Sequence, residues 1–241
     1  MAYQFEIGIV LQQWEQLVEG AAMTLGLTAA SVAAGTVIGT AGAVASTYGG
    51  NWLKKLAAAY VEAIRNTPFL VQLFIVFFGL PTIGLQVDAL TAALLAMSIN
   101  LGAYSTEIIR AGVQAIHPSQ LEAAMALAMT RWQMIRHVVL VPAFEKVYPA
   151  LTSQFTLMML TSSVVSGISV EELTAVASRI DSESFRTFET YTTVMVLYIG
   201  LALLMRLGFY GLGQLLFRRR RVLKRARREA VRVKSLKKVA A

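Results

Sequence analysis

Cysteine is absent from this chain of 241 residues, and histidine occurs only twice. Without cysteine there is no disulfide, no thiolate metal site and no cysteine nucleophile. His137 has no carboxylate or cysteine at metal-ligand spacing, and His117 begins a predicted turn before a proline. No Gly-x-x-x-x-Gly-Lys-Ser/Thr loop occurs in these residues to hold ATP phosphates. The sequence therefore indicates neither a resident metal nor an ATP site.

Charge is also scarce: 15% of the residues are charged, 56% are hydrophobic, and the mean hydropathy is +0.59. That is too apolar for an ordinary soluble domain. After Phe217 come twelve Lys and Arg against one acid, Glu229, a tail charge of +11 that leaves −3 for the rest of a +8 chain. No aromatic residue is interleaved with these cations to stack on bases. We therefore interpret residues 218–241 as a basic cytoplasmic tail that contacts membrane lipid rather than nucleic acid.

Several charge-poor stretches approach the roughly 20 apolar residues that a membrane-crossing helix needs. The sequence predicts an all-α integral membrane protein with about five transmembrane helices, at residues 21–46, 56–80, 89–112, 147–170 and 190–217. The second stretch is interrupted by Glu62, Arg65 and Pro68, so its first turns are expected at the interface or against other helices. In the first, Gly35-x-x-x-Gly39 predicts a face for close helix packing.

The distribution of basic residues predicts the orientation of these helices. Five spans after an acidic start put the N-terminus outside and the tail inside. Lys54, Lys55 and the region 131–146 then fall on the cytoplasmic side as well. Outside, we expect a short loop at 81–88 and a polar, net negative loop at 171–189.

The stretch 119–144 has a different pattern from the spans around it. Apolar residues recur at steps of three and four, which predicts one amphipathic helix. Ser119 is expected as its N-cap, Glu122 as a favourable charge in its first turn, and Pro142 as its stop or kink. Such a helix is suited to lie flat on a membrane or to dock in a groove of a partner. Its apolar stripe comprises Leu121, Met125, Ala128, Trp132, Ile135 and Val139.

Polar residues inside the third and fourth spans are candidates for a solute pathway. Asn100, Tyr104 and Glu107 fall on one helical face, with Arg110 beside them. A charged group in hydrocarbon costs roughly 2.5–3.5 kcal/mol, so Glu107 either faces a pathway or pairs with Arg110 near the cytoplasmic boundary. In the fourth span the hydroxyl groups either line the pathway or bond to carbonyls of their own helix. The candidates there are Thr161, Ser162 and Ser163.

Four segments resemble permease subunits of ABC importers, especially the polar amino-acid (histidine/glutamate/arginine-type) group. Residues 61–74 resemble the pattern Glu-x-x-Arg-Gly-Thr-Pro-Leu-Leu-Val-Gln, and residues 100–112 resemble Gly-Ala-Tyr-x-x-Glu-x-x-Arg-x-Gly. Residues 168–173 match Ile-x-Val-x-Glu-Leu. Glu122-Ala123-Ala124, followed by Leu140-x-Pro142, resembles the cytoplasmic coupling helix. Three positions depart from the pattern: Ala128 replaces the usual Gly, Pro142 comes about one residue late, and residues 160–163 lack the Lys-Asp-Thr-Ser common in relatives.

This resemblance implies a type I ABC importer-like fold, with residues 1–217 as the permease domain. It implies a non-enzymatic transport subunit of the bacterial inner membrane, which moves a polar amino acid, or a related solute such as an opine, delivered by a periplasmic binding protein. ATP and Mg²⁺ would be bound by separate ATPase chains, and a second permease subunit, identical or paralogous, would complete the pathway. The ATPase-coupling residues would be Glu122, Ala123, Ala124, Ala128, Arg131 and Trp132.

Three other interpretations are weaker. An intramembrane enzyme needs a catalytic constellation, but both histidines lie outside the spans and no Ser–His or metal spacing occurs. A stand-alone channel or secondary transporter is expected to have internal repeats and ion-pathway acids, and five spans do not divide that way. A membrane-tethered nucleic-acid binder would rest on the tail alone.

Overall fold

The computed structural model describes residues 5–217, which form helices and contain no strand. Their contacts divide the chain into unit 1, residues 1–203, and unit 2, residues 204–241. The predicted basic tail, 218–241, lies outside the described residues. Four helices are long and apolar enough to cross a membrane, or five if one bent pair counts as a span. The predicted fold class is thereby confirmed.

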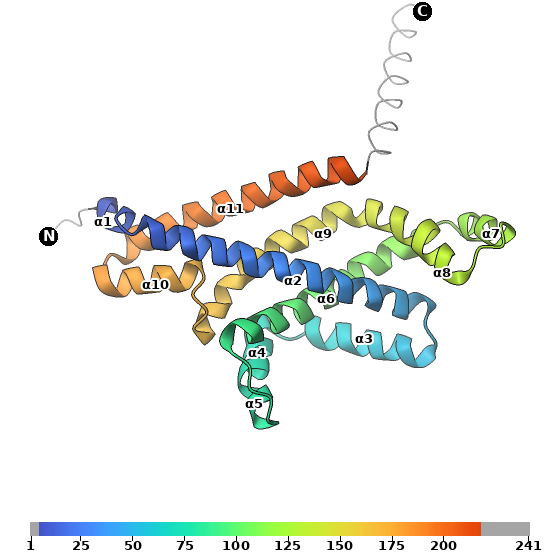
Figure 1. The fold of residues 1–241 in the computed structure, drawn as a ribbon, viewed down its shortest axis with the longest axis horizontal. Helices are drawn as coiled ribbons and strands as arrows, with labels where there is room; N and C mark the ends of the chain where they lie inside the picture. Colours follow the sequence, from blue (N-terminus) through green and yellow to red (C-terminus); the bar gives the residue numbers. More distant parts are fainter. Residues whose placement is uncertain (1–4, 218–241) are drawn as a thin grey trace, which may run out of the picture. The chain divides into compact units, whose positions relative to one another are not determined.

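Helices α2 (Trp14–Tyr48) and α6 (Ala89–Gln114) form the centre of unit 1 (Figure 1). They correspond to the first and third predicted spans, although α2 begins at Trp14 rather than at 21. The apolar stretch of α6 is 67% buried, against 28% for that of α2. The side chain of Asp88 caps α6 by accepting a hydrogen bond from the Thr91 N–H. Other helices surround α6 on most sides, so it is the scaffold for its neighbours.

Glycine is what lets α2 and α6 approach each other closely. A Cβ atom added at Gly39 would lie 2.4 Å from the Ser105 Cβ, and one at Gly35 would lie 2.9 Å from the Leu101 Cβ. On the opposite helix, a Cβ at Gly102 would lie 2.6 Å from Ile38. In lipid, helix association depends on such packing because burial from water contributes little. The packing face predicted from Gly35-x-x-x-Gly39 is confirmed.

The second predicted span is bent. Helix α3 (Asn51–Arg65) packs on α2 and α6, and the chain then turns by 108° into a helical stretch over 69–82. This stretch comprises α4 (Phe69–Phe74), the π-helical turn η1 (Ile75–Gly79) and α5 (Leu80–Thr82). The interruption expected at Glu62, Arg65 and Pro68 is thus a sharp bend, and the expected packing of the first turns against other helices is confirmed. Pro68 disfavours helical geometry in the residue before it, which explains the break.

A side-chain amide holds this bend in place. Gln72 Nε2 donates to the carbonyl oxygens of Ile64 (2.7 Å) and Thr67 (3.0 Å) and to the Thr67 hydroxyl (2.8 Å). The Gln72 Oε1 atom in turn accepts from Asn100 Nδ2 at 2.8 Å. Gln72 thereby satisfies carbonyls that the broken helix leaves without partners, and Asn100 ties the bend to α6.

The predicted amphipathic helix over 119–144 is wrong as a single element. Helix α7 (Pro118–Ala126) is capped by His117, not Ser119, and ends before a second helix that starts at Arg131. That second helix is continuous from Arg131 to Ile168 and contains the predicted span 147–170 except its last two residues. Pro142 does not stop it. Its parts are α8 (Arg131–Gln133), the π-helical η2 (Met134–Leu140), α9 (Val141–Thr161) and the 3₁₀ segment η3 (Ser162–Ile168).

Ala128 makes the turn between α7 and α8. Its φ of 53° lies in the left-handed region. The N–H of Met129 donates to the Ala124 carbonyl at 3.2 Å, and the N–H of Ala128 donates to the Met125 carbonyl at 2.9 Å. This pair of bonds is a Schellman motif, whose left-handed position favours glycine because a Cβ is strained there. The left-handed backbone at residue 128 thus explains why glycine is usual at this position in the pattern that the segment resembles.

The predicted loop at 171–189 contains a helix, α10 (Leu173–Ser184). Its buried side chains, Leu173, Val176, Ala177 and Ile180, pack in a cluster with Leu17 of α2. Glu172 caps α10 by accepting from the Ala175 N–H at 3.0 Å, and it also accepts from the Tyr198 hydroxyl at 2.8 Å. Burial raises the pKa of the Glu172 carboxyl group, because a charged carboxylate is poorly solvated there.

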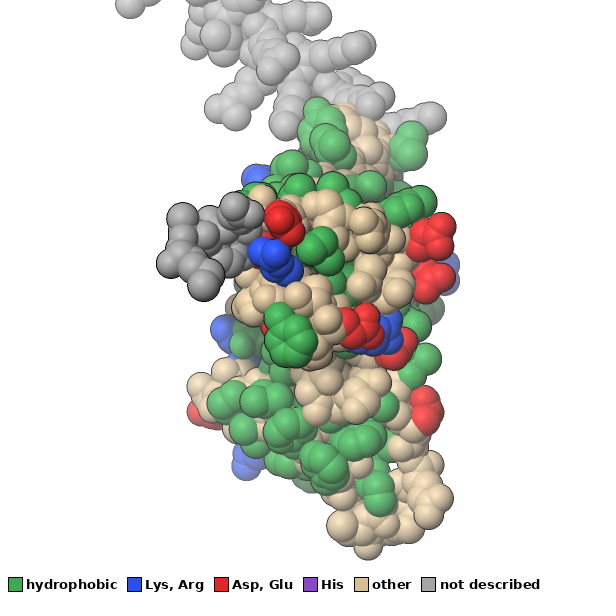
Figure 2. All heavy atoms as spheres, turned by 90° about the vertical axis from the view of Figure 1, so that its left-hand side faces the viewer, with side chains coloured by type: hydrophobic (Ala, Val, Ile, Leu, Met, Phe, Trp, Pro, Cys, Tyr) green, Lys and Arg blue, Asp and Glu red, His purple; other side chains and the backbone are tan. Residues whose placement is uncertain are grey.

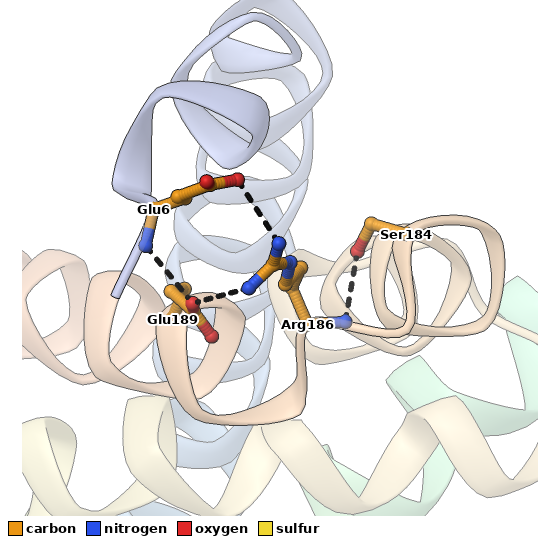
Figure 3. A network of polar contacts seen from close by, with 4 residues as sticks. All are labelled: Glu6, Ser184, Arg186 and Glu189. Carbon is orange, nitrogen blue, oxygen red and sulfur yellow. Dashed lines mark hydrogen bonds and ion pairs between the residues drawn. The ribbon is translucent and has the colours of Figure 1, made fainter. Parts of the chain in front are cut away.

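An ion-pair network fastens the short α1 (Ile7–Leu11) to the start of α11 (Thr187–Leu216), the last predicted span (Figure 3). The Arg186 guanidinium lies 3.0 Å from the Glu6 carboxylate and 3.5 Å from the buried Glu189 carboxylate. The Glu6 backbone N–H donates to Glu189 at 3.1 Å. Arg186 therefore neutralises a carboxylate that is fully buried.

The glycine contact leads to a first prediction. Gly39→Ala places a methyl group against the backbone of α6, so we expect it to lower the stability of the protein by about 1–3 kcal/mol. Gly26→Ala is the matched control, because a Cβ there has nothing within 4 Å. Thermal unfolding in detergent measures both. Equal midpoints for the two variants would contradict the close-packing account.

The turn at Ala128 leads to a second prediction. Ala128→Gly removes left-handed strain of about 1–2 kcal/mol, partly offset by the greater entropy of glycine in the unfolded chain. The remaining gain of about 1 kcal/mol corresponds to a roughly fivefold rise in hydrogen-exchange protection across α7. Ala123→Gly, inside α7, should lower that protection instead. A change of the same sign in both variants would contradict the account.

Candidate functional site

The α7–α8 turn forms an exposed tip of unit 1, at the end opposite to α1 and α10 (Figure 1). His117 Nδ1 accepts from the Ser119 N–H and so fixes the first turn of α7. At the second helix, Thr130 and Gln133 form a capping box, each side chain bonding the backbone N–H of the other. The short connection is thus well defined at both ends.

Large apolar side chains are exposed on this tip. Met125, Leu127 and Trp132 are 60%, 77% and 64% exposed. Glu122 and Arg131 lie exposed beside them, and neither forms an ion pair with another residue of the described range 5–217. Apolar side chains flanked by unpaired charges of both signs are typical of a docking surface. We call these five residues the tip surface.

The predicted coupling residues do not all lie on this surface. Glu122, Ala123, Ala128, Arg131 and Trp132 are exposed, as a docking role requires. Ala124 is only 3% exposed and faces its own protein, where α7 packs on η2. Sequence reasoning left Met125 and Leu127 out of the coupling residues, although Met125 was part of the predicted apolar stripe. They were missed because one continuous helix was assumed, and the turn at 127–130 changes which apolar residues face outward.

A cavity of about 560 Å³ lies between α3 and α6, with the end of α2 beside it. It is large enough for a small polar solute. Its charged and aromatic lining comes from both helices: Lys54, Glu62, Arg65, Tyr104, Glu107 and Arg110. Three of the predicted pathway residues, Tyr104, Glu107 and Arg110, are therefore brought together here. The residues from α3 were not predicted as part of a site.

The charges of α6 in the cavity neutralise each other. Arg110 contacts Glu107 with two nitrogen atoms, Nη2 to Oε1 at 2.5 Å and Nε to Oε2 at 3.1 Å. Both side chains are about one-third exposed. The predicted Glu107–Arg110 pair is confirmed, and a role for Glu107 in a pathway stays a prediction. The possible pair between Glu62 and Arg65 does not form; the Arg65 guanidinium carbon lies 5.4 Å from the centre of the Tyr104 ring instead.

The remaining predicted pathway residues lie elsewhere. Asn100 is 6% exposed, and its amide is bonded to Gln72 at the bend rather than facing the cavity. Thr161, Ser162 and Ser163 donate to carbonyls of their own helix, those of Leu157, Met159 and Leu160. The hydroxyl groups thus bond to their own helix, which was one of the two roles expected for them. Neither Asn100 nor these three residues line the cavity. Whether they contact a solute in an assembled transporter stays a prediction.

Similar sequences fall into one group of membrane transport subunits. Residues 20–222 match the family model described as "Binding-protein-dependent transport system inner membrane component". The glutamine transport system permease protein GlnP of Escherichia coli (strain K12) is 36% identical over 84% of this chain and 93% of its own length. The octopine transport system permease protein OccM of Rhizobium radiobacter is 32% identical over 81% of this chain and 83% of its own.

Solved structures agree with these sequences. A chain of the "amino acid ABC transporter with histidines" is 35% identical, with a TM-score of 0.77, over 90% of this chain and 100% of its own. A chain of the MetNI methionine ABC transporter in an inward-facing conformation has a TM-score of 0.73 at 21% identity, which supports the fold alone.

The packed spans, the exposed tip between two of them and the family match over most of the chain lead to one conclusion: this chain belongs to the family of inner-membrane permease components of binding-protein-dependent ABC transport systems.

Proposed function

We propose that this permease subunit carries a polar α-amino acid, or an amino-acid derivative such as an opine, into the cell in an ATP-driven importer. The observation that carries the proposal is the tip surface, an exposed apolar and charged patch joined directly to the spans. ATPase subunits bind this surface, and they alone bind ATP and Mg²⁺. This chain holds no cofactor and carries out no chemistry; it converts movement of the tip into movement of the spans.

The continuity of the connection supports the coupling role. One continuous helix runs from Arg131, on the tip surface, to Ile168, deep in the helix packing. A displacement of Trp132 is therefore transmitted along a helix of 38 residues without an intervening loop. The capping box at Thr130 and Gln133 keeps the entry to this helix fixed.

The class of solute is supported by the charges of the cavity and by the relatives. A cavity with two acids and three cations suits a small molecule that itself carries both charges. The relatives named for glutamine and octopine transport have amino-acid or amino-acid-derived solutes in their printed names. A second permease subunit, identical or paralogous, completes the pathway.

The opposite end of unit 1, formed by α1 and α10, is our candidate docking surface for a periplasmic solute-binding protein, together with residues 81–88. Figure 2 shows this end, where acidic and basic side chains are mixed with hydrophobic ones. The exposed pair of Glu171 and Arg179 contributes there, with the nitrogen and oxygen atoms 2.8 Å apart. In this orientation the N-terminus is periplasmic and the C-terminus is cytoplasmic, in contact with lipid.

Reversing the charge of Glu122 tests the coupling role. In the complex with its ATPase and binding protein, reconstituted in liposomes, Glu122→Arg should lower solute-stimulated ATP hydrolysis at least about tenfold. The physical reason is that a contact between like charges in a desolvated interface costs more than about 1.4 kcal/mol. Basal hydrolysis, which belongs to the ATPase chains, should change little.

Glu15→Arg is the matched control, because Glu15 is an exposed acid in the first turn of α2, away from the tip surface. Because Glu15 lies near the proposed docking end of the binding protein, its readout is the ATPase alone: Glu15→Arg should co-purify with the ATPase subunits as wild type does. Full stimulation in Glu122→Arg would refute the coupling role of the tip surface.

A further inference from the structure

Three cavity charges remain after the Glu107–Arg110 pair is formed: Lys54, Glu62 and Arg65. Glu62 and Arg65 both line the cavity, one turn apart on α3. Within residues 5–217, no hydrogen bond or ion pair joins either side chain to a partner. Residues three apart on a helix have Cβ atoms about 5–6 Å apart, close enough for one small molecule to reach both. The cavity therefore presents one cation and one anion side by side.

Tyr104 prepares Arg65 to bind an anion. The guanidinium carbon lies 5.4 Å from the centre of the Tyr104 ring, a cation–π contact that holds the group against one wall. Within residues 5–217 the N–H donors of Arg65 form no hydrogen bond. Those donors match the two oxygen atoms of a carboxylate, with which Arg forms paired hydrogen bonds. Tyr104 is thus a positioning residue for Arg65.

The other cavity charges are paired or lie further along the helix, although the Glu107 carboxylate also attracts Arg65 electrostatically. Arg110 is held by Glu107 through two contacts. Lys54 is eleven residues before Arg65 on the same helix, which at 1.5 Å per residue places it roughly 16 Å away, at the far end of the cavity.

We propose that Glu62 and Arg65 form a binding site for a zwitterionic α-amino acid, in which Arg65 holds the α-carboxylate and Glu62 holds the α-ammonium group. This inference rests on the proposed function and makes it more specific: a solute must carry both groups free and adjacent.

Binding to the purified permease–ATPase complex in nanodiscs, without binding protein, tests the site. The probes are the twenty radiolabelled amino acids and octopine; the tightest binder is then compared with its α-carboxamide and with its analogue lacking the amino group. We expect Arg65→Gln to weaken binding of the amino acid at least about tenfold but not that of the α-carboxamide. Glu62→Gln should abolish the preference over the analogue without the amino group. Arg65→Lys, which keeps the charge but not the paired donors, should lie between wild type and Arg65→Gln.

Lys54→Gln is the control, because it removes the same charge from the same helix and cavity without touching the proposed site. It should leave binding unchanged, and size-exclusion profiles should match wild type in all variants. Equal weakening by Lys54→Gln and Arg65→Gln would overturn the site in favour of a general positive potential. Solute-stimulated hydrolysis in wild type with unchanged binding in Arg65→Gln would overturn the site alone. If no probe binds to the wild-type complex and none stimulates its ATP hydrolysis, the proposed function is overturned together with the site.

Discussion

The close approach of α2 and α6 is the constraint on which the rest of the structure depends. Inside a membrane, apolar side chains gain little by leaving lipid for protein, so helices must be held by shape. Here glycines remove the side chains that would keep the two backbones apart, and Gly39 against Ser105 is the tightest point. Because α6 is fixed in this way, α3 and α9 pack against a rigid surface, and the cavity lies where α3 passes α6.

Polar groups in this framework are divided between structural and available roles. Gln72, Asn100 and the hydroxyls of α9 are occupied by the backbone or by each other, which is how polar groups are tolerated in lipid. Glu62 and Arg65 in the cavity, and Glu122 and Arg131 on the tip surface, have no such partners among the described residues. The available charges therefore lie at two places, one suited to a solute and one to a protein partner.

Hydropathy was enough to predict the membrane spans and Gly35-x-x-x-Gly39 was enough to predict a packing face, because both depend on local composition. The errors came from features that depend on backbone geometry or distant contacts. The turn at Ala128 could not be predicted, since alanine ordinarily continues a helix. Helix α10 was missed because its polar composition concealed the spacing of Leu173, Val176, Ala177 and Ile180, which does indicate a helix. The contact of Arg65 with Tyr104 joins residues of two helices, and periodicity carries no information about it.

The central claim is that the tip surface contacts an ATPase on the cytoplasmic side, and the absence of cysteine makes it directly testable by crosslinking. A single cysteine at Met125, which is 60% exposed, is compared with one at Phe188, which is 65% exposed at the opposite end of unit 1. In the assembled complex, a short thiol-reactive photocrosslinker on Met125→Cys should join this chain to the ATPase subunit, and the same reagent on Phe188→Cys should not. An ATPase adduct from Phe188→Cys but none from Met125→Cys would contradict the account.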